Sequence, residues 1–305
     1  GDVYKRQLLF NAFLATLEPG DEVITPAPYW VSYTDMAMLN GGVPKVIPCD
    51  AAQGFKLRPE QLEAAITPRT RWVMLNSPNN PSGAIFTREE LAALGAVLER
   101  HPHVLVISDE IYEHIVLGEQ PFVSFVTACP QLRERTLLIN GVSKAYAMTG
   151  YRLGYAAGPK NLIVAMNKTQ SQTTTCPSSI SQLAAVAALN GPQDFVREAN
   201  REYQARGELV VRGLAQIPGL QLEMPQGAFY AFPNVAAFIG KRTPDGEVIG
   251  NDAELSAYLL RVGKVATVPG SAFGLEPYVR LSFATSRQEL EQALGQLRDA
   301  FAALA

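Results

Sequence analysis

The stretch that decides the fold is Asn140-Gly141-Val142-Ser143-Lys144-Ala145-Tyr146-Ala147-Met148-Thr149-Gly150-Tyr151-Arg152-Leu153-Gly154. It follows the apolar, β-type run of residues 136–139, so Lys144 is expected just beyond the carboxyl end of a buried strand. Open α/β sheets bind their ligands at that edge. Because glycines in this stretch allow the backbone to approach a ligand closely, we interpret it as a binding turn.

The residue types in this stretch suit one kind of ligand. Ser143 supplies a hydroxyl, and Arg152 supplies a fork of guanidinium donors that can bind a phosphate. The amine of Lys144 can react with an aldehyde. A phosphate and an aldehyde on one carrier describe pyridoxal phosphate, which we expect to be held as a Schiff base on Lys144.

The rest of the first two thirds of the chain alternates between strand and helix patterns. The strands are expected at residues 22–25, 43–48, 71–76, 104–107 and 136–139. The helices are expected at residues 8–17, 32–39, 59–66, 87–100, 162–170 and 178–189. This order predicts an α/β fold with a mostly parallel sheet and helices on both faces.

The pattern changes after residue 193. A long helix is expected from residue 194 to 215 and a last helix from 288 to 304, with strands between them at residues 220–223, 228–232, 265–268 and 279–283. We therefore divide the chain into a large cofactor-binding domain, residues 8–193, and a small α+β domain, residues 194–305. Residues 1–7 contain no secretory signal. We expect them to be a non-native head, because there is no initiator Met and the helix-like run from residue 8 has no structure of its own upstream.

Composition excludes several classes of protein. The 305 residues carry a net charge of -3, which gives no support for nucleic-acid binding. No apolar run is long enough to span a membrane. The cysteines are few and scattered, which is typical of reduced thiols in the cytoplasm. His101 and His103 lack further ligands nearby, so we predict a polar turn there and no metal site.

Polar and aromatic residues with suitable chemistry follow several of the expected strands. Asp109 ends an apolar strand, and it is either an exposed strand-end residue or a charge directed at the ligand, where it would keep the pyridine nitrogen protonated. Tyr112 and Asn80 can hydrogen-bond the phenolic oxygen of the ring. Trp30 is either a core aromatic or a flat face for stacking on the ring. Arg280 can grip a carboxylate with two hydrogen bonds.

Segments spread along the chain resemble the class I/II aminotransferases of fold type I, close to the bacterial aspartate aminotransferase branch. Each segment is weak alone, but their shared order and spacing carry the resemblance. It implies a seven-stranded type of sheet and a cis bond between Asn80 and Pro81. The matching segments are residues 18–23, 76–83, 108–112, 143–152, 268–274 and 278–282.

The resemblance also implies roles for individual positions. The catalytic residues are expected to be Lys144, Asp109 and Tyr112. The contacts to pyridoxal phosphate are expected from Trp30, Asn80, Asp109, Tyr112, Ser143, Lys144 and Arg152. The substrate is expected to bind Arg280, Asn80 and Trp30. The implied reaction is a ping-pong transfer of an amino group from an L-amino acid, with aspartate favoured, to a 2-oxo acid.

The resemblance leaves other points open. Family members have a segment before residue 8 that completes the site, so we expect the chain as written to bind the cofactor weakly and to be poorly active. A homodimer is implied. One alternative is another fold type I enzyme, a C–S lyase or a synthase. Another is the aminotransferase-like effector domain of a transcription regulator.

Overall fold

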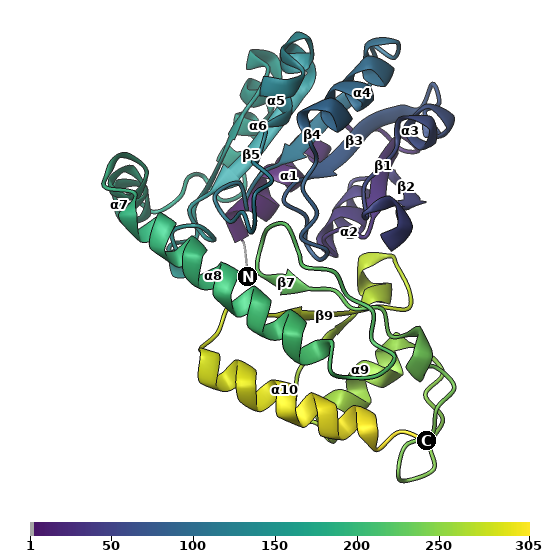
Figure 1. Ribbon diagram of the computed structural model, residues 1–305. Helices are drawn as coiled ribbons and strands as arrows, with labels where there is room; N and C mark the ends of the chain where they lie inside the picture. Colours follow the sequence, from purple (N-terminus) through teal and green to yellow (C-terminus); the bar gives the residue numbers. More distant parts are fainter. Residues whose placement is uncertain (1–2) are drawn as a thin grey trace.

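The computed structural model describes residues 3–305, and its largest element is a six-stranded sheet (Figure 1). The strand order is β2-β1-β3-β4-β5-β6; β1 to β5 are parallel, and β6 runs antiparallel to β5. The five strands predicted before residue 193 are confirmed. The bounds are β1 Glu22–Ala27, β2 Val43–Pro48, β3 Thr70–Asn76, β4 Leu105–Asp109, β5 Thr136–Gly141 and β6 Gly154–Ala157.

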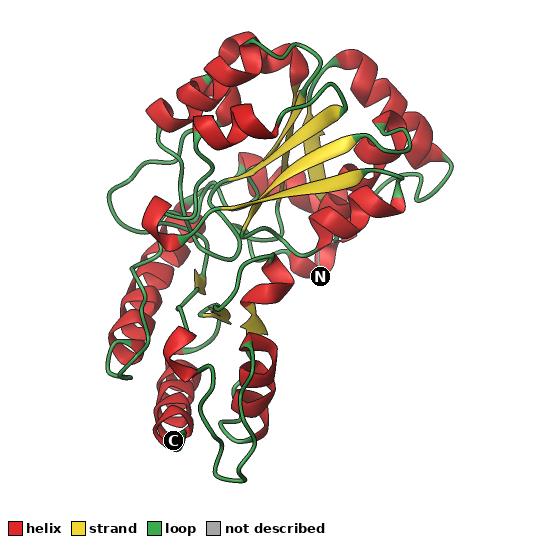
Figure 2. Cartoon of the chain, turned by 90° about the vertical axis from the view of Figure 1, so that its right-hand side faces the viewer, coloured by secondary structure: helices red, strands yellow, loops and turns green. Residues whose placement is uncertain are grey.

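Helices cover both faces of this sheet, as predicted (Figure 2). Adjacent strand residues show the two faces: Val73 packs with α3 and α4, whereas Trp72 packs with α1, α2 and α6. Side chains alternate across a strand, so the central strands must be apolar on both sides. The helices are α1 Val3–Thr16, α2 Ser32–Leu39, α3 Pro59–Ala65, α4 Arg88–Glu99, α5 Phe125–Ala128, α6 Lys160–Ser171 and α7 Ser179–Asn190.

A three-stranded antiparallel sheet, ordered β7-β9-β8, forms the centre of the remainder of the chain. α8 and α10 pack together over it through Val210, Leu214, Leu290 and Leu297. α8 begins at Asp194, next to the expected domain boundary, and the division into domains stays a prediction. The bounds are α8 Asp194–Leu214, β7 Tyr230–Ala231, α9 Asp252–Arg261, β8 Val268–Pro269, β9 Val279–Ser282 and α10 Arg287–Ala302.

Several expected elements differ from the structure. Residues 220–223 form no strand, and only Gln221 makes an isolated bridge, to Asn234. The described sheet has six strands where the resemblance implied a seven-stranded type. β6 and α9 were not predicted, and α1 begins at Val3 instead of residue 8. Within residues 3–305 no helix is long and apolar enough to cross a membrane.

Candidate active site

The site is built at the carboxyl ends of β3, β4 and β5. β3 ends at Asn76 and β4 at Asp109, and these two residues are register partners in neighbouring parallel strands. The Asn76 amide donates to the backbone oxygen of Asp109 at 2.9 Å and accepts a hydrogen bond from the backbone N–H of Asn80 at 2.9 Å. The Asn80–Pro81 bond is cis, as the resemblance implies. The proline-rich loop is therefore tied directly to the strand ends.

Asp109 is completely buried, which rules out the interpretation of this residue as an exposed strand end. Its Oδ2 accepts hydrogen bonds from the hydroxyl of Tyr33 and from Nζ of Lys5, the latter at 2.8 Å. A buried carboxylate needs such partners, because an unpaired charge in a protein interior is costly. Asp109 is therefore a charge directed at cationic and donor groups, not an exposed strand end.

A cation lies between Asp109 and Trp30. The ammonium of Lys5, on α1, is 2.8 Å from the Asp109 carboxylate and 4.1 Å from the centre of the Trp30 ring. Ring faces attract cations, and the carboxylate neutralises the charge. Trp30 is half-buried beside Tyr33, with ring centres 5.5 Å apart. The carboxylate of Asp109 and the ring face of Trp30 thus form a binding site for a flat or cationic group, called the seat below.

A second set of contacts links the smaller sheet, which carries Arg280, to the loop after β3, which carries Asn80. Arg280, on β9, donates to Oδ1 of Asn80 at 2.8 Å. Its guanidinium carbon lies 4.4 Å from the ring centre of Tyr230 and 4.9 Å from that of Phe273. Nε of Arg280 is buried and has no hydrogen-bond partner within the described residues. The guanidinium is therefore held in one plane with donor capacity still available.

Tyr112 lies at the centre of this set of contacts. Its hydroxyl is 2.8 Å from the hydroxyl of Tyr230. Burial raises the pKa of Tyr112 well above its usual value, and the neighbouring Tyr230 and Asp109 act in the same direction. Tyr112 therefore stays protonated at neutral pH, as a hydrogen-bond donor should.

Lys144 lies three residues beyond the end of β5. Its Nζ is 5.8 Å from the ring centre of Tyr112 and 5.8 Å from that of Phe229. Ser143 is buried. Arg152 adopts a left-handed backbone conformation with φ 55°, and its Nη1 donates to the backbone oxygen of Thr149 at 2.6 Å. Nη2 of Arg152 is buried without a hydrogen-bond partner in residues 3–305, so it could bind an anion.

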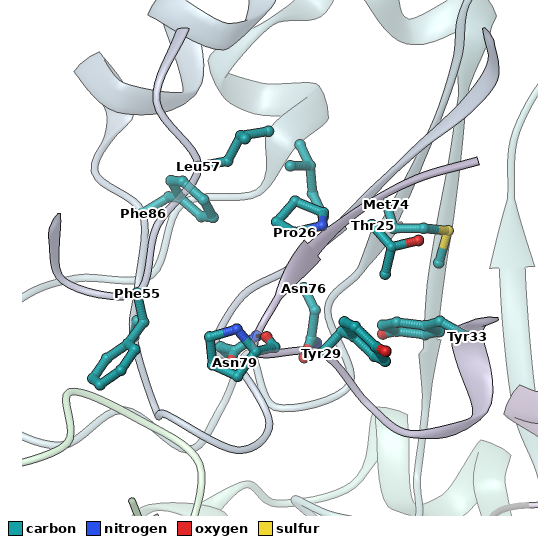
Figure 3. Close-up of a pocket in the computed structure, with 13 residues that line it drawn as sticks. Thr25, Pro26, Tyr29, Tyr33, Phe55, Leu57, Met74, Asn76, Asn79 and Phe86 are labelled. Atoms are coloured by element: carbon teal, nitrogen blue, oxygen red, sulfur yellow. Dashed lines mark hydrogen bonds between the residues drawn. The ribbon is translucent and has the colours of Figure 1, made fainter. Parts of the chain in front are cut away.

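A small cavity of about 20 Å³ adjoins the site on the side of β1 and β3. Tyr29, Tyr33, Asn76 and Asn79 line it together with apolar side chains such as Leu57 (Figure 3). A space of this size holds about one water molecule. This cavity is therefore too small for a cofactor or a substrate.

The donor set fits pyridoxal phosphate. The buried carboxylate of Asp109 suits a protonated ring nitrogen, and the unpartnered Nη2 of Arg152 suits a phosphate. One contact conflicts with that fit. Lys5 contacts Asp109 and Trp30, the same two residues that the ring would need, so its side chain has to withdraw before the ring can bind.

Two site residues were missed by sequence reasoning. Tyr33 donates to Asp109, and its position three residues after Trp30 at the start of an expected helix is a signal that could have been used. Tyr230 contacts both Tyr112 and Arg280. It is 118 residues from Tyr112 in the sequence, and no local pattern connects the two.

Comparison with known proteins agrees with the geometry. A family model described as "Aminotransferase class I and II" matches residues 6–297. An aspartate aminotransferase of Rhizobium meliloti (strain 1021) is 56% identical over 292 residues, which are 96% of this chain and 71% of that protein. An aspartate/prephenate aminotransferase of Cereibacter sphaeroides is 51% identical over 293 residues, covering 96% of this chain and 73% of that protein.

A solved structure agrees as closely in three dimensions. The crystal structure of the aspartate aminotransferase from Rhizobium meliloti superposes with a TM-score of 0.96 at 54% sequence identity. The superposition covers 99% of this chain and 76% of that one. Both the large sheet and the smaller C-terminal part are therefore shared with that protein.

Proposed function

Because the chain belongs to the class I and II aminotransferase family, we propose that it transfers the amino group of L-aspartate to a 2-oxo acid, with pyridoxal phosphate bound at Lys144. The chain is an enzyme of the aminotransferase type; the donor, the cofactor and the residue roles are the proposed parts. Aspartate is chosen because it is named in the Rhizobium meliloti relative. Prephenate, named in the Cereibacter sphaeroides relative, is the second candidate for the keto partner.

The roles of the cofactor-binding residues follow from their chemistry. Pyridoxal phosphate, when bound, supplies an aldehyde and a ring that accepts electrons from the substrate. Asp109 keeps a proton on the ring nitrogen, and Trp30 stacks on the ring face. Tyr112 and Asn80 donate hydrogen bonds to the phenolic oxygen. Anchoring of the phosphate is assigned to Ser143 and Arg152.

The substrate is handled by residues on both sides of the crevice. Arg280 binds the α-carboxylate, and Asn80, which accepts a hydrogen bond from Arg280, holds the guanidinium in place. Trp30 limits the space beside the substrate. Lys144 would take the proton from the substrate α-carbon and return it to the C4′ carbon of the cofactor, on the other side of the substrate nitrogen. The 2-oxo acid leaves before the second 2-oxo acid binds, which gives ping-pong kinetics.

One observation supports the proposal above the others. The seat formed by Asp109 and Trp30 already holds a cation, the ammonium of Lys5, in a buried ion pair. A protonated ring nitrogen needs the same combination of a buried carboxylate and an aromatic face. A carboxylate with a purely structural role would not need an aromatic face above its partner.

The test is an absorption spectrum of the purified protein with added pyridoxal phosphate. We expect a visible band that is absent in Lys144→Ala and present in Lys168→Ala, a control that removes an exposed lysine of α6. L-aspartate should bleach this band and release one oxaloacetate for each site. Release of ammonia from a donor without formation of an aminated product would favour a lyase. A band that persists in Lys144→Ala would contradict the assignment of the lysine.

We also propose that two copies of the chain associate. The support is a row of exposed apolar side chains on α7, with Ile180 74%, Leu183 72% and Val186 56% exposed. Apolar rows of this kind on a helix are typical of protein interfaces. A homodimer is also what the family resemblance implies.

A further inference from the structure

One buried side chain, Tyr230, contacts two proposed site residues that have different tasks. Its hydroxyl lies 2.8 Å from the hydroxyl of Tyr112, and its ring centre lies 4.4 Å from the guanidinium carbon of Arg280. Tyr230 is on β7, which pairs with β9, the strand that carries Arg280. The smaller sheet thus contacts Tyr112, which follows β4 of the large sheet, through this tyrosine.

The contact between the hydroxyls of Tyr230 and Tyr112 limits the direction in which the Tyr112 hydroxyl can donate its hydrogen. A tyrosine hydroxyl donates only one hydrogen bond, although it can accept others. Either hydroxyl can be the donor in this contact. When Tyr230 donates to Tyr112, the hydrogen of Tyr112 has to point away from Tyr230. The Tyr112 ring cannot turn to compensate, because it packs edge-on against the rings of Phe229 and Tyr230 at 5.5 and 5.9 Å.

The ring contact controls the plane of a guanidinium. The guanidinium of Arg280 lies close to the rings of both Tyr230 and Phe273, and one of its nitrogens donates to Asn80. Aromatic faces stabilise a desolvated guanidinium and restrict its rotation. A carboxylate that binds with two hydrogen bonds needs that plane fixed in advance.

We propose that Tyr230 is a positioning residue that orients two groups of the site, the hydroxyl of Tyr112 and the guanidinium of Arg280. Its hydroxyl directs the Tyr112 hydroxyl toward the cofactor's phenolic oxygen, and its ring orients Arg280 for the substrate carboxylate. This inference rests on the proposed function for the first task. The second task concerns only residues of the chain and can be measured without cofactor.

The two tasks can be separated with two substitutions. Tyr230→Phe removes the hydroxyl and keeps the ring, whereas Tyr230→Leu removes both. The matched control is Tyr203→Phe, which removes a hydroxyl from a half-buried tyrosine whose ring centre lies 5.3 Å from that of Phe229 in the same aromatic cluster. Each variant is measured in two ways: the pH midpoint of the visible band with pyridoxal phosphate bound, and calorimetric binding of succinate to the cofactor-free protein.

We expect Tyr230→Phe to raise the pH midpoint by about half a pH unit, because a less directed Tyr112 stabilises the anionic phenolic oxygen less well. Succinate binding should stay within about twofold of the unmodified protein in this variant. Tyr230→Leu should weaken succinate binding by about fivefold to tenfold. Tyr203→Phe should change neither quantity.

A double-variant cycle tests whether the hydroxyl acts through Tyr112. Adding Tyr230→Phe to Tyr112→Phe should move the midpoint no further, because the hydroxyl to be directed is already gone. If Tyr230→Phe shifted the midpoint equally in the unmodified protein and in Tyr112→Phe, the hydroxyl of Tyr230 would not act through Tyr112. An unchanged pH midpoint in Tyr230→Phe would show that the hydroxyl does not direct Tyr112. Succinate binding in Tyr230→Leu equal to that of the unmodified protein would show that the ring does not orient Arg280. Absence of a Lys144-dependent band in the unmodified protein would instead contradict the proposed function, and succinate binding would still decide the role of the ring.

Discussion

At the scale of single residues, Glu110 is a buried acid next to the proposed active site. It is 2% exposed, and its Oε1 accepts hydrogen bonds from the hydroxyls of Ser108 and Ser124 and from the backbone N–H of Phe125, at 2.8, 2.9 and 3.0 Å. Burial raises the pKa of Glu110 to about 7, against the lowering effect of those hydrogen bonds. The carboxyl is therefore partly protonated at neutral pH.

This raised pKa predicts a pH dependence of stability. Between an unfolded pKa near 4.5 and a folded pKa of about 7, the folded state binds more protons than the unfolded state. The contribution of Glu110 to stability is therefore fully present below pH 4.5 and is lost as the pH rises through about 7. Its size is at most roughly 3 kcal/mol. Glu110→Gln should flatten the dependence of unfolding free energy on pH across this window.

The measurement is urea unfolding at several pH values between 4.5 and 8. Glu134→Gln is the control, because it removes an exposed carboxylate from the same part of the chain. We expect this control to keep the slope of the unmodified protein. Parallel curves for Glu110→Gln and the unmodified protein would show that the buried carboxyl does not titrate in this range.

The residues of the site differ in how far the sequence can predict them. Lys144 and Asp109 could be found because each follows an apolar strand, and the carboxyl ends of parallel strands meet at one edge. Burial of Asp109 could not be read from the sequence, since it depends on Tyr33 and Lys5 from other elements. The same holds for Tyr230, which reaches Tyr112 only through the packing of two sheets.

At the scale of elements, local patterns predicted most helices and central strands but not every strand of the structure. α2 matches its prediction at both ends, and α4, which begins where it was predicted, has a capping box formed by Thr87 and Glu90. β6 was missed because Gly154–Ala157 has neither β-branched residues nor alternation, and it is held by pairing with β5. Residues 220–223 show a strand-like alternation, but only Gln221 finds a partner. Strand formation in these segments depends on neighbours that a local pattern does not contain.

The helix α1 provides a prediction about cofactor binding. It brings Lys5 to Asp109 and Trp30, where the ammonium competes with a ring for the same two residues. Lys5→Ala should therefore raise the affinity for pyridoxal phosphate by about tenfold. It should also lower the stability of the cofactor-free protein, because removing one member of a buried ion pair leaves the other uncompensated.

The affinity is measured by titrating the visible band, and the stability by thermal unfolding without cofactor. Arg6→Ala is the matched control. It removes a neighbouring positive charge that lies 5.3 Å from the Trp30 ring centre, and within the described residues Asp109 forms its ion pair with Lys5 and not with Arg6. Equal affinities for Lys5→Ala and the unmodified protein would show that Lys5 does not compete. If Arg6→Ala raised the affinity for pyridoxal phosphate by the same amount, the effect would come from removal of any nearby positive charge and not from loss of the Lys5–Asp109 ion pair.

At the scale of the whole molecule, the two sheets meet at the crevice through close backbone contacts. The N–H of Gly227 donates to the oxygen of Gly83 at 2.8 Å, and a Cβ on Gly227 would lie 2.7 Å from the Pro78 side chain. The proline-rich loop is therefore clamped between the large sheet and β7. This arrangement holds Asn80 of one part against Arg280 of the other, so the site depends on both parts at once.

The surface of the whole molecule predicts its association. α7 lies at the outer edge of the molecule, away from α9 and α10 (Figure 1), and its exposed row of Ile180, Leu183 and Val186 has no partner within the described chain. We expect the protein to sediment as a dimer and Ile180→Asp/Leu183→Asp to sediment as a monomer, because two charges in an apolar interface cannot be solvated. Met38→Asp/Leu39→Asp is the control, since it places the same charges on another exposed apolar pair, 55% and 76% exposed on α2. If the control variant dissociated while the α7 variant stayed dimeric, the dimer interface would lie at α2 and not at α7. If the unmodified protein sedimented as a monomer, the proposed dimer itself would be wrong.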